Sequence, residues 1–145
     1  MSDVKTYNPK KVIVTANGIP ISGVADDTFV EFERSSDSFE KHVGSQGEVS
    51  RTQTADKSGS CTITLAQTSP TNDLFSGLAQ IDELTGAGVI VLACTDLSGT
   101  SVLMGAMAWI KKPAKAGFGK AVGNRLWVFD IAEYEVWNGG NVGVM

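Results

Sequence analysis

The segment from Ser36 to Asp73 constrains the fold most, because a long polar, glycine-containing stretch precedes one short β pattern and a helix start. Hydrophobic side chains are almost absent between Val49 and Cys61. Ordering such a segment costs about 1–2 kcal/mol of backbone entropy per residue, and a lone subunit gains little apolar burial in return. We therefore expect residues 35–58 to be either disordered or an extended polar loop or hairpin that folds against something outside its own core.

The remaining composition is that of a single globular domain. The chain has 145 residues, of which 42% are hydrophobic and 19% charged. A domain of this size buries about 68–70% of the surface that its unfolded chain exposes, so we expect one domain over residues 1–145. The formal net charge of −4 argues against tight nucleic-acid binding, which needs clustered lysine and arginine. It is compatible with a surface past which DNA slides.

Targeting and membrane signals are absent from the sequence. The N-terminal residues contain no apolar core of signal-peptide length. No stretch approaches the roughly 18 consecutive apolar residues of a membrane helix. These patterns predict a protein that is made in the cytoplasm and does not insert into a membrane by itself.

Alternating apolar patterns and turn signals predict about eight to ten short strands. Asn17-Gly18 between apolar runs is a strong hairpin signal, because both residues tolerate positive φ. The stretch 101–111 is apolar on both faces, so we expect both to be covered, by its own core or by a neighbour. The polar segments 38–44 and 48–54 either pair as a hairpin or form a loop. The other strands are expected over residues 12–14, 19–24, 28–34, 58–66, 89–95 and 125–137.

One α-helix is predicted over about Pro70–Leu84. Ser69 can cap its N-terminus, Pro70 suits the first turn, and Asp73 favours the positive end of the helix dipole. Gly86 is expected to end the helix. With the strands, this predicts a mainly β fold, a two-sheet β-sandwich or barrel with one flanking helix. The apolar stripe expected to pack on the sheet consists of Leu74, Phe75, Leu78 and Ile81.

The sequence offers no set of residues that would carry catalysis or bind a metal. Cys61 and Cys94 lie in apolar strand patterns, where free thiols are usually buried, and no paired-cysteine or histidine cluster accompanies them. His42 is the only histidine, and no nucleophile or orienting group can be assigned to it. The glycine-rich stretch 117–123 lacks the spacing of a phosphate-binding loop. We therefore expect no enzyme activity, no catalytic or metal site and no cofactor.

Two clusters of side chains have alternative interpretations. The carboxylates around strand 28–34 are interpreted as a solvated acidic face rather than as an acid–base or calcium site. The late aromatic residues are interpreted as core or subunit contacts; the alternative is a platform for stacking on a sugar or base, although a nucleic-acid platform needs basic neighbours. The clusters are Asp26, Asp27, Glu31 and Glu33, and Trp109, Trp127, Phe129, Tyr134 and Trp137.

A series of short motifs spans nearly the whole chain, from Tyr7-Asn8-Pro9-Lys10 to Gly139-Gly140-Asn141. In their order and spacing they resemble the tail tube proteins of contractile-tailed bacteriophages. The loop 114–123 fits that pattern least well. The motifs between the two ends are Asp37-Ser38-Phe39, Val43-Gly44, Gly47-Glu48-Val49-Ser50-Arg51, Ser58-Gly59, Gln67-Thr68-Ser69, Asn72-Asp73, Ala108-Trp109-Ile110, Lys112-Pro113, Gly119-Lys120, Asn124-Arg125 and Trp127-Val128.

This resemblance implies a two-sheet β fold with one flanking helix, hexameric rings that stack into a hollow tube, and a continuous β-barrel around the lumen. It implies that residues 35–58 contact neighbouring subunits and the next ring, with a large intersubunit surface offsetting the ordering entropy. The tube would be a conduit for DNA, which passes without specific binding. The implied partners are further copies of the chain, the tail sheath protein, the tape measure protein, and the baseplate and tail terminator proteins of the virion.

Two sets of residues are candidate sites in such an assembly. Strand alternation and net acidity predict a polar, acidic face that would line the lumen and repel phosphates. The polar extension would contact neighbouring subunits, with Arg51 pairing with an acidic residue there. The lumen candidates are Glu31, Glu33, Ser60, Thr62 and Thr64, and the contact candidates are Phe39, Val43, Val49 and Arg51.

Two other classes of protein remain open. A secretion-system tube, a flexible-tail tube or a baseplate ring protein would share the architecture and differ in its partners. A small β-sandwich that binds carbohydrate would instead be a monomer with a pocket near Trp109 or Trp137. Ring formation separates the first class from the second.

Overall fold

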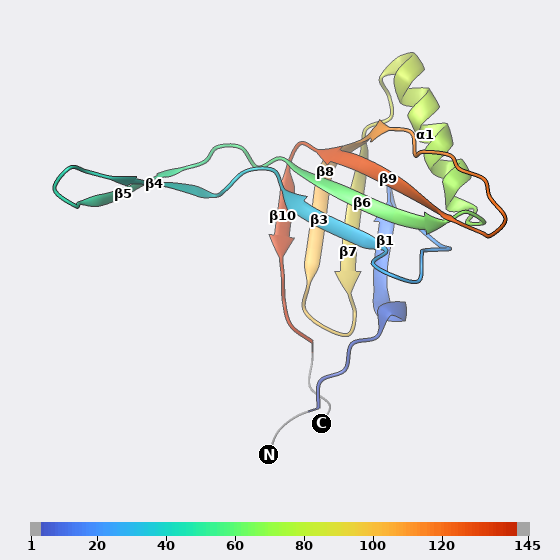
Figure 1. Ribbon diagram of the computed structural model, residues 1–145, viewed down its shortest axis with the longest axis horizontal. Coiled ribbons are helices and arrows are strands. Elements are labelled where there is room, and N and C mark those ends of the chain that lie inside the picture. Colours follow the sequence, from blue (N-terminus) through green and yellow to red (C-terminus); the bar gives the residue numbers. More distant parts are fainter. Residues whose placement is uncertain (1–3, 142–145) are drawn as a thin grey trace.

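The computed structural model describes residues 4–141, and within them the fold is mainly β, with ten strands and one α-helix (Figure 1). A 3-10 turn, Pro9–Lys11, precedes the first strand. The helix is α1 (Thr71–Thr85). The strands are β1 (Val12–Ala16), β2 (Ile19–Pro20), β3 (Val30–Arg34), β4 (Phe39–Val43), β5 (Val49–Gln53), β6 (Gly59–Ala66), β7 (Ile90–Asp96), β8 (Val102–Lys112), β9 (Asn124–Ile131) and β10 (Tyr134–Trp137).

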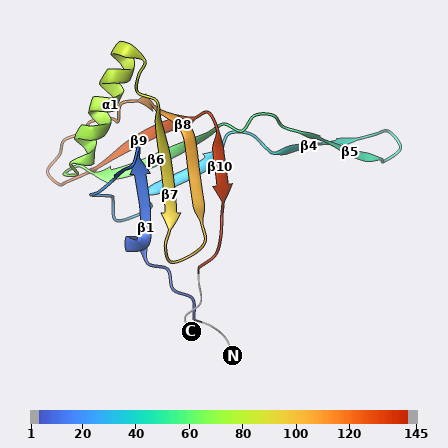
Figure 2. The same ribbon diagram turned by 180° about the vertical axis from the view of Figure 1, so that it is seen from behind.

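Eight strands form one antiparallel sheet in the order β2-β1-β7-β8-β9-β6-β3, and β10 pairs with β8 outside this path. The long strand β8 belongs to both halves of the sheet, because Val102–Gly105 pairs with β10 whereas Ala108–Lys112 pairs with β9. Strands β1, β7, β8 and β10 run roughly vertically in Figure 1, and β9, β6 and β3 cross them. Figure 2 shows the same two layers from behind. The two expected sheets are therefore two layers of one folded sheet.

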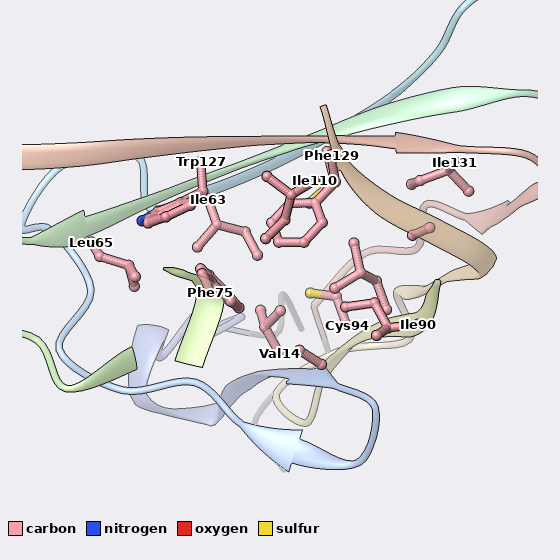
Figure 3. Close-up of a cluster of buried hydrophobic side chains, with 14 of the residues drawn as sticks. Val14, Ile63, Leu65, Phe75, Ile90, Cys94, Ile110, Trp127, Phe129 and Ile131 are labelled. Atoms are coloured by element: carbon pink, nitrogen blue, oxygen red, sulfur yellow. The ribbon is translucent and has the colours of Figure 1, made fainter. Parts of the chain in front are cut away.

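The hydrophobic core lies between these layers (Figure 3). Strand β6 alternates between buried and half-buried residues along its whole length, as its sequence predicts. Phe75 of α1 enters from one end and meets two aromatic rings of β9 edge-on, Trp127 at 5.6 Å and Phe129 at 5.1 Å between ring centroids. The core residues labelled in the figure are Val14, Ile63, Leu65, Phe75, Ile90, Cys94, Ile110, Trp127, Phe129 and Ile131.

The helix begins and ends as predicted, but its buried stripe is narrower than expected. The Thr71 N–H donates to the Ser69 hydroxyl at 3.1 Å, and Gly86 ends the helix with a left-handed φ of 71°. The buried row is Thr71, Phe75 and Ala79, at i, i+4 spacing. Ile81 lies off this row and is 50% exposed, so its predicted place in the core is wrong. The reason is that α1 meets the end of the sandwich with one edge (Figure 1).

Two strand predictions need correction. The return strand expected over 19–24 is a strand only at Ile19–Pro20. The Ile21 N–H still donates to the Val14 carbonyl of β1, but the Ser22 N–H donates to the Thr71 hydroxyl, and Val24 forms an isolated bridge with Leu65 of β6. The strand expected over 125–137 breaks after Ile131, because Ala132 and Glu133 bond back to β8: the Ala132 N–H donates to the Met107 carbonyl, and the Ala106 N–H donates to the Glu133 carbonyl. Within residues 4–141, β8 is covered on one face only, so that coverage of its other face by a neighbour, the second expected possibility, stays a prediction. The side chains exposed on its other face are Val102, Met104 and Met107.

Strands β4 and β5 form an antiparallel hairpin, here called the arm, rather than a loop. The register runs from Phe39 opposite Gln53 to Val43 opposite Val49. Gly47 has a φ of 89° in the turn, a conformation that glycine adopts without steric cost. The arm projects away from the two-layer body in both views (Figures 1 and 2).

Candidate assembly surfaces

The first surface is the outward face of β3, β6 and β9, here called the acidic face. Glu31 lies opposite Thr62 and Glu33 lies opposite Ser60. Directly opposed residues of an antiparallel pair project from the same side of the sheet. The structure therefore brings the predicted set together on one face. Its members are Glu31, Glu33, Ser60, Thr62 and Thr64.

Strand β9 adds three residues to the acidic face that the sequence analysis did not include. Leu126, Val128 and Asp130 lie opposite Thr64, Thr62 and Ser60 respectively. The signal was present in the sequence, because Leu126, Val128 and Asp130 alternate with the apolar residues Trp127, Phe129 and Ile131. Asp130 gives the face a third carboxylate, and Leu126, which is exposed, gives it an aliphatic margin.

The second surface is one face of the arm, whose five residues in each strand are all exposed. The register places all four predicted contact residues on the same side and adds Lys41, which lies opposite Arg51. The Arg51 guanidinium lies 4.0 Å from the centre of the Phe39 ring, a cation–π contact. The opposite side of the hairpin is more polar, with His42 hydrogen-bonded to Thr52 at 3.0 Å. The basic apolar face of the arm is Phe39, Lys41, Val43, Val49 and Arg51.

The root of the arm is tied to the body by hydrogen bonds. Arg34, the last residue of β3, donates from Nε and Nη2 to the Tyr134 carbonyl of β10 at 3.1 and 2.9 Å. Asp56 accepts from the Ser58 N–H and from the Ser36 hydroxyl, each at 2.9 Å. The hydrogen bonds from Ser58 and, to a smaller extent, from Ser36 lower the pKa of Asp56 below its ordinary value of 3.8. The arm is thus held at its base and free along its strands.

The third surface is the outward side of β7, β8 and β10, here called the apolar outer face. Register places Thr95, Val102 and Trp137 in one row, and Ala93, Met104 and Glu135 in the next. Trp137 is 68% exposed. A shallow depression of about 290 Å³ lies on this side. It is lined by Val102, Met104, Glu135, Val136 and Trp137.

The thiols and three residues of the aromatic cluster, Trp127, Phe129 and Tyr134, are buried in the core, whereas Trp137 lies on the apolar outer face. Cys61 and Cys94 are free and buried, as predicted. Burial raises the pKa of the Cys94 thiol to about 11 and raises the pKa of Cys61 further, so neither is a reactive thiolate at neutral pH. Trp127 is buried with its indole N–H donating to Asn72 Oδ1 at 3.0 Å. It is therefore not available as part of a stacking platform.

Within residues 4–141, no group of three or more histidine, cysteine or acidic side chains is placed to hold a metal ion. No helix in the same range is long and apolar enough to cross a membrane.

Residues 15–139 match the family model described as the bacteriophage PhiTE tail tube protein. The chain belongs to this family of phage tail tube proteins. A relative in Pseudomonas phage KPP10, described as structural protein ORF10, is 30% identical over 144 residues and covers 94% of this chain and 83% of its own length. The resemblance inferred from the motifs is confirmed, and the tail tube family protein is a structural component of the phage virion tail.

Solved structures of similar fold come from phage-tail-like injection systems. The anti-feeding prophage cap, which terminates the AFP tube, has a TM-score of 0.61 at 7% identity and covers 94% of both chains. The sheath/tube terminator of the extracellular contractile injection system PVC has a TM-score of 0.53 at 9% identity, covering 92% of this chain and 97% of its own. At such low identity these likenesses show that the tail tube family protein shares their fold and nothing more.

Proposed function

We propose that the protein is the tube subunit of a contractile phage tail, which forms hexameric rings that stack into the inner tail tube. The tube is the conduit for DNA ejection and houses the tape measure protein. The observation that carries this proposal is the match of residues 15–139 to a tail tube family. It favours a structural role over an enzyme or a carbohydrate-binding module.

The arm supports assembly, because its strands have no core of their own. Val43 and Val49 are 60% and 67% exposed, and an isolated two-stranded hairpin is marginally stable in water. A specific protein interface buries about 1,200–2,000 Å² in total. An arm laid on a neighbouring subunit contributes to such an area, and the burial offsets the entropy of ordering it.

The acidic face supports a role as the lining of the lumen. Its carboxylates on β3 and β9 flank a band of hydroxyl groups on β6, and like charges repel the phosphates of passing DNA. Within residues 4–141, strand β3 pairs only with β6, so its other edge is open in this part of the subunit. Pairing of such edges between subunits would close a continuous barrel and remove edges that invite aggregation. Glu31, Glu33, Ser60, Thr62 and Thr64 are the proposed lumen residues.

The proposed partners follow from a position in the tail. The sheath protein would surround the tube, the tape measure protein would lie within it, and baseplate and terminator proteins would meet its two ends. DNA would pass through the lumen without specific binding.

A second candidate function is that of a terminator or cap ring at the end of the tube. The observation that favours it is the nature of the two solved structures of similar fold, a tube cap and a sheath/tube terminator. A terminator forms one ring and stops, whereas a tube subunit propagates.

The first experiment is negative-stain electron microscopy of the purified recombinant protein, with size-exclusion chromatography alongside. Tubes of variable length are expected for a tube subunit, and single rings that do not stack would instead support the terminator. A species that stays monomeric at high concentration and also fails to add to purified baseplates or tail fragments would contradict both.

A further inference from the structure

The apolar outer face leaves large hydrophobic side chains exposed on strands that lie inside the sheet rather than at its edge. Val102 and Met104 are 47% and 45% exposed, although their strand is central in the sheet. Together with Trp137 they border a depression with Glu135 at its margin. Contiguous exposed apolar surface of this kind marks an interaction site.

The basic apolar face of the arm has matching chemistry, and its residues are exposed rather than packed on the part of the body that the structure describes. Val43 and Val49 lie at the tip end of the hairpin, directly opposite one another, and Lys41 and Arg51 form the next pair. Each strand has five residues and spans about 17 Å at 3.3–3.4 Å per residue. The arm extends away from the body (Figures 1 and 2), so it can reach a second molecule.

We propose that the basic apolar face of the arm docks on the apolar outer face of a second copy of this chain. The Val43–Val49 pair fills the depression beside Val102 and Met104, and Arg51 or Lys41 approaches Glu135. This inference rests on the proposed assembly into rings and identifies the surface that receives the arm.

Apolar character and charge together favour this surface over the acidic face as the site that receives the arm. The acidic face offers carboxylates, but its centre is a band of hydroxyl groups that gives the two valines little apolar contact. The apolar outer face offers aliphatic side chains, a carboxylate at Glu135 and an exposed indole at Trp137. Lys and Arg side chains bind well over such a ring. The arm of one subunit and the outer face of the next are different surfaces. The contact between them is therefore head-to-tail, as cyclic rings and stacked helices require.

Directed disulfide formation between two variants tests the docking. Full-length Val49→Cys and full-length Met104→Cys, carrying tags of different size, are mixed and oxidised gently at neutral pH. The native thiols need no replacement, because Cys61 and Cys94 are buried. Thr64→Cys, on the acidic face, replaces Met104→Cys as the matched control. Circular dichroism verifies that each variant keeps the wild-type fold.

We expect Val49→Cys to form a disulfide-linked heterodimer with Met104→Cys. The yield of this heterodimer should clearly exceed the yield of the heterodimer between Val49→Cys and Thr64→Cys. A second measurement uses charge: Arg51→Glu and Glu135→Arg should each weaken assembly alone, and an equimolar mixture should regain part of it, because the altered arm then meets an altered acceptor.

The inference is overturned if Val49→Cys links to Thr64→Cys at least as well, or if neither pair links while wild-type protein forms rings. If wild-type protein forms rings but neither pair links, the proposed function stands, and the apolar outer face would instead bind another tail protein. If the wild type forms no ring and adds to no tail fragment, and if neither cysteine pair gives a cross-link, the proposed function and this inference fail together.

Discussion

Replacing Phe75 by alanine should destabilise the subunit strongly, because this side chain is the only contribution of α1 to the aromatic centre of the core shown in Figure 3. Phe75 is fully buried and meets Trp127 and Phe129 edge-on. Truncation of a buried phenylalanine costs about 3–5 kcal/mol, and this range includes the lost aromatic contacts and the cavity. For a domain whose stability is about 5–15 kcal/mol, that is a large share.

Ile81→Ala is the matched control, since it removes an apolar side chain from the same helix at a half-exposed position. We expect a cost below about 1 kcal/mol, as for surface substitutions generally. Urea denaturation followed by tryptophan fluorescence, on variants kept monomeric at low concentration, gives both values. The sequence pattern alone places both residues on one buried stripe. Similar losses for Phe75→Ala and Ile81→Ala would therefore refute the packing of α1 described here.

Three further predictions concern the arm and the acidic face. Deleting residues 38–54 should abolish tubes in electron micrographs while leaving cooperative unfolding intact; a deletion variant that still assembles would contradict the role of the arm. Reversing Glu31 and Glu33 to lysine should permit assembly but impair DNA ejection, and unchanged infectivity would count against the lumen assignment. The pKa of Asp56 is lowered in the fold, so the stabilisation of the arm root is complete above pH 3.8 and is lost as pH falls through the lower, folded pKa. Cleavage of the arm by pepsin should accordingly increase on acidification in the wild type, and Asp56→Asn, which lacks the titration, should show a flatter pH dependence.

Local sequence patterns predicted the parts of the fold that depend on near neighbours. Period-two alternation identified the buried side of β6, and the Ser69-to-Gly86 signals bounded α1 within about a residue or two, the usual precision of helix ends. The face shared by Glu31, Glu33 and the β6 hydroxyls followed from the same alternation once the two strands paired.

What the sequence did not reveal depends on contacts between distant segments. The break between β9 and β10 is set by hydrogen bonds of Ala132 and Glu133 to β8, and no local signal encodes them. The exposure of Ile81 depends on the angle at which α1 meets the sandwich. The apolar outer face could be predicted only in part. The pattern of residues 101–111 left open whether their own core or a neighbour covers each face, and the strand order shows that no other element within residues 4–141 covers Val102 and Met104 on the outer side.

The way the arm is fixed has an energetic consequence for assembly. A free two-stranded hairpin would have to be ordered at the moment of docking, and immobilising flexible segments reduces affinity. Here Arg34 holds the start of the arm against the Tyr134 carbonyl, and Asp56 holds its return through Ser36 and Ser58. Much of the ordering cost at the root is therefore met when the subunit folds, before any neighbour is present. Because Tyr134 begins the same strand that carries Glu135 and Trp137, the structure that aims the arm also positions the proposed receiving surface. Folding of one subunit thus prepares both halves of a head-to-tail contact.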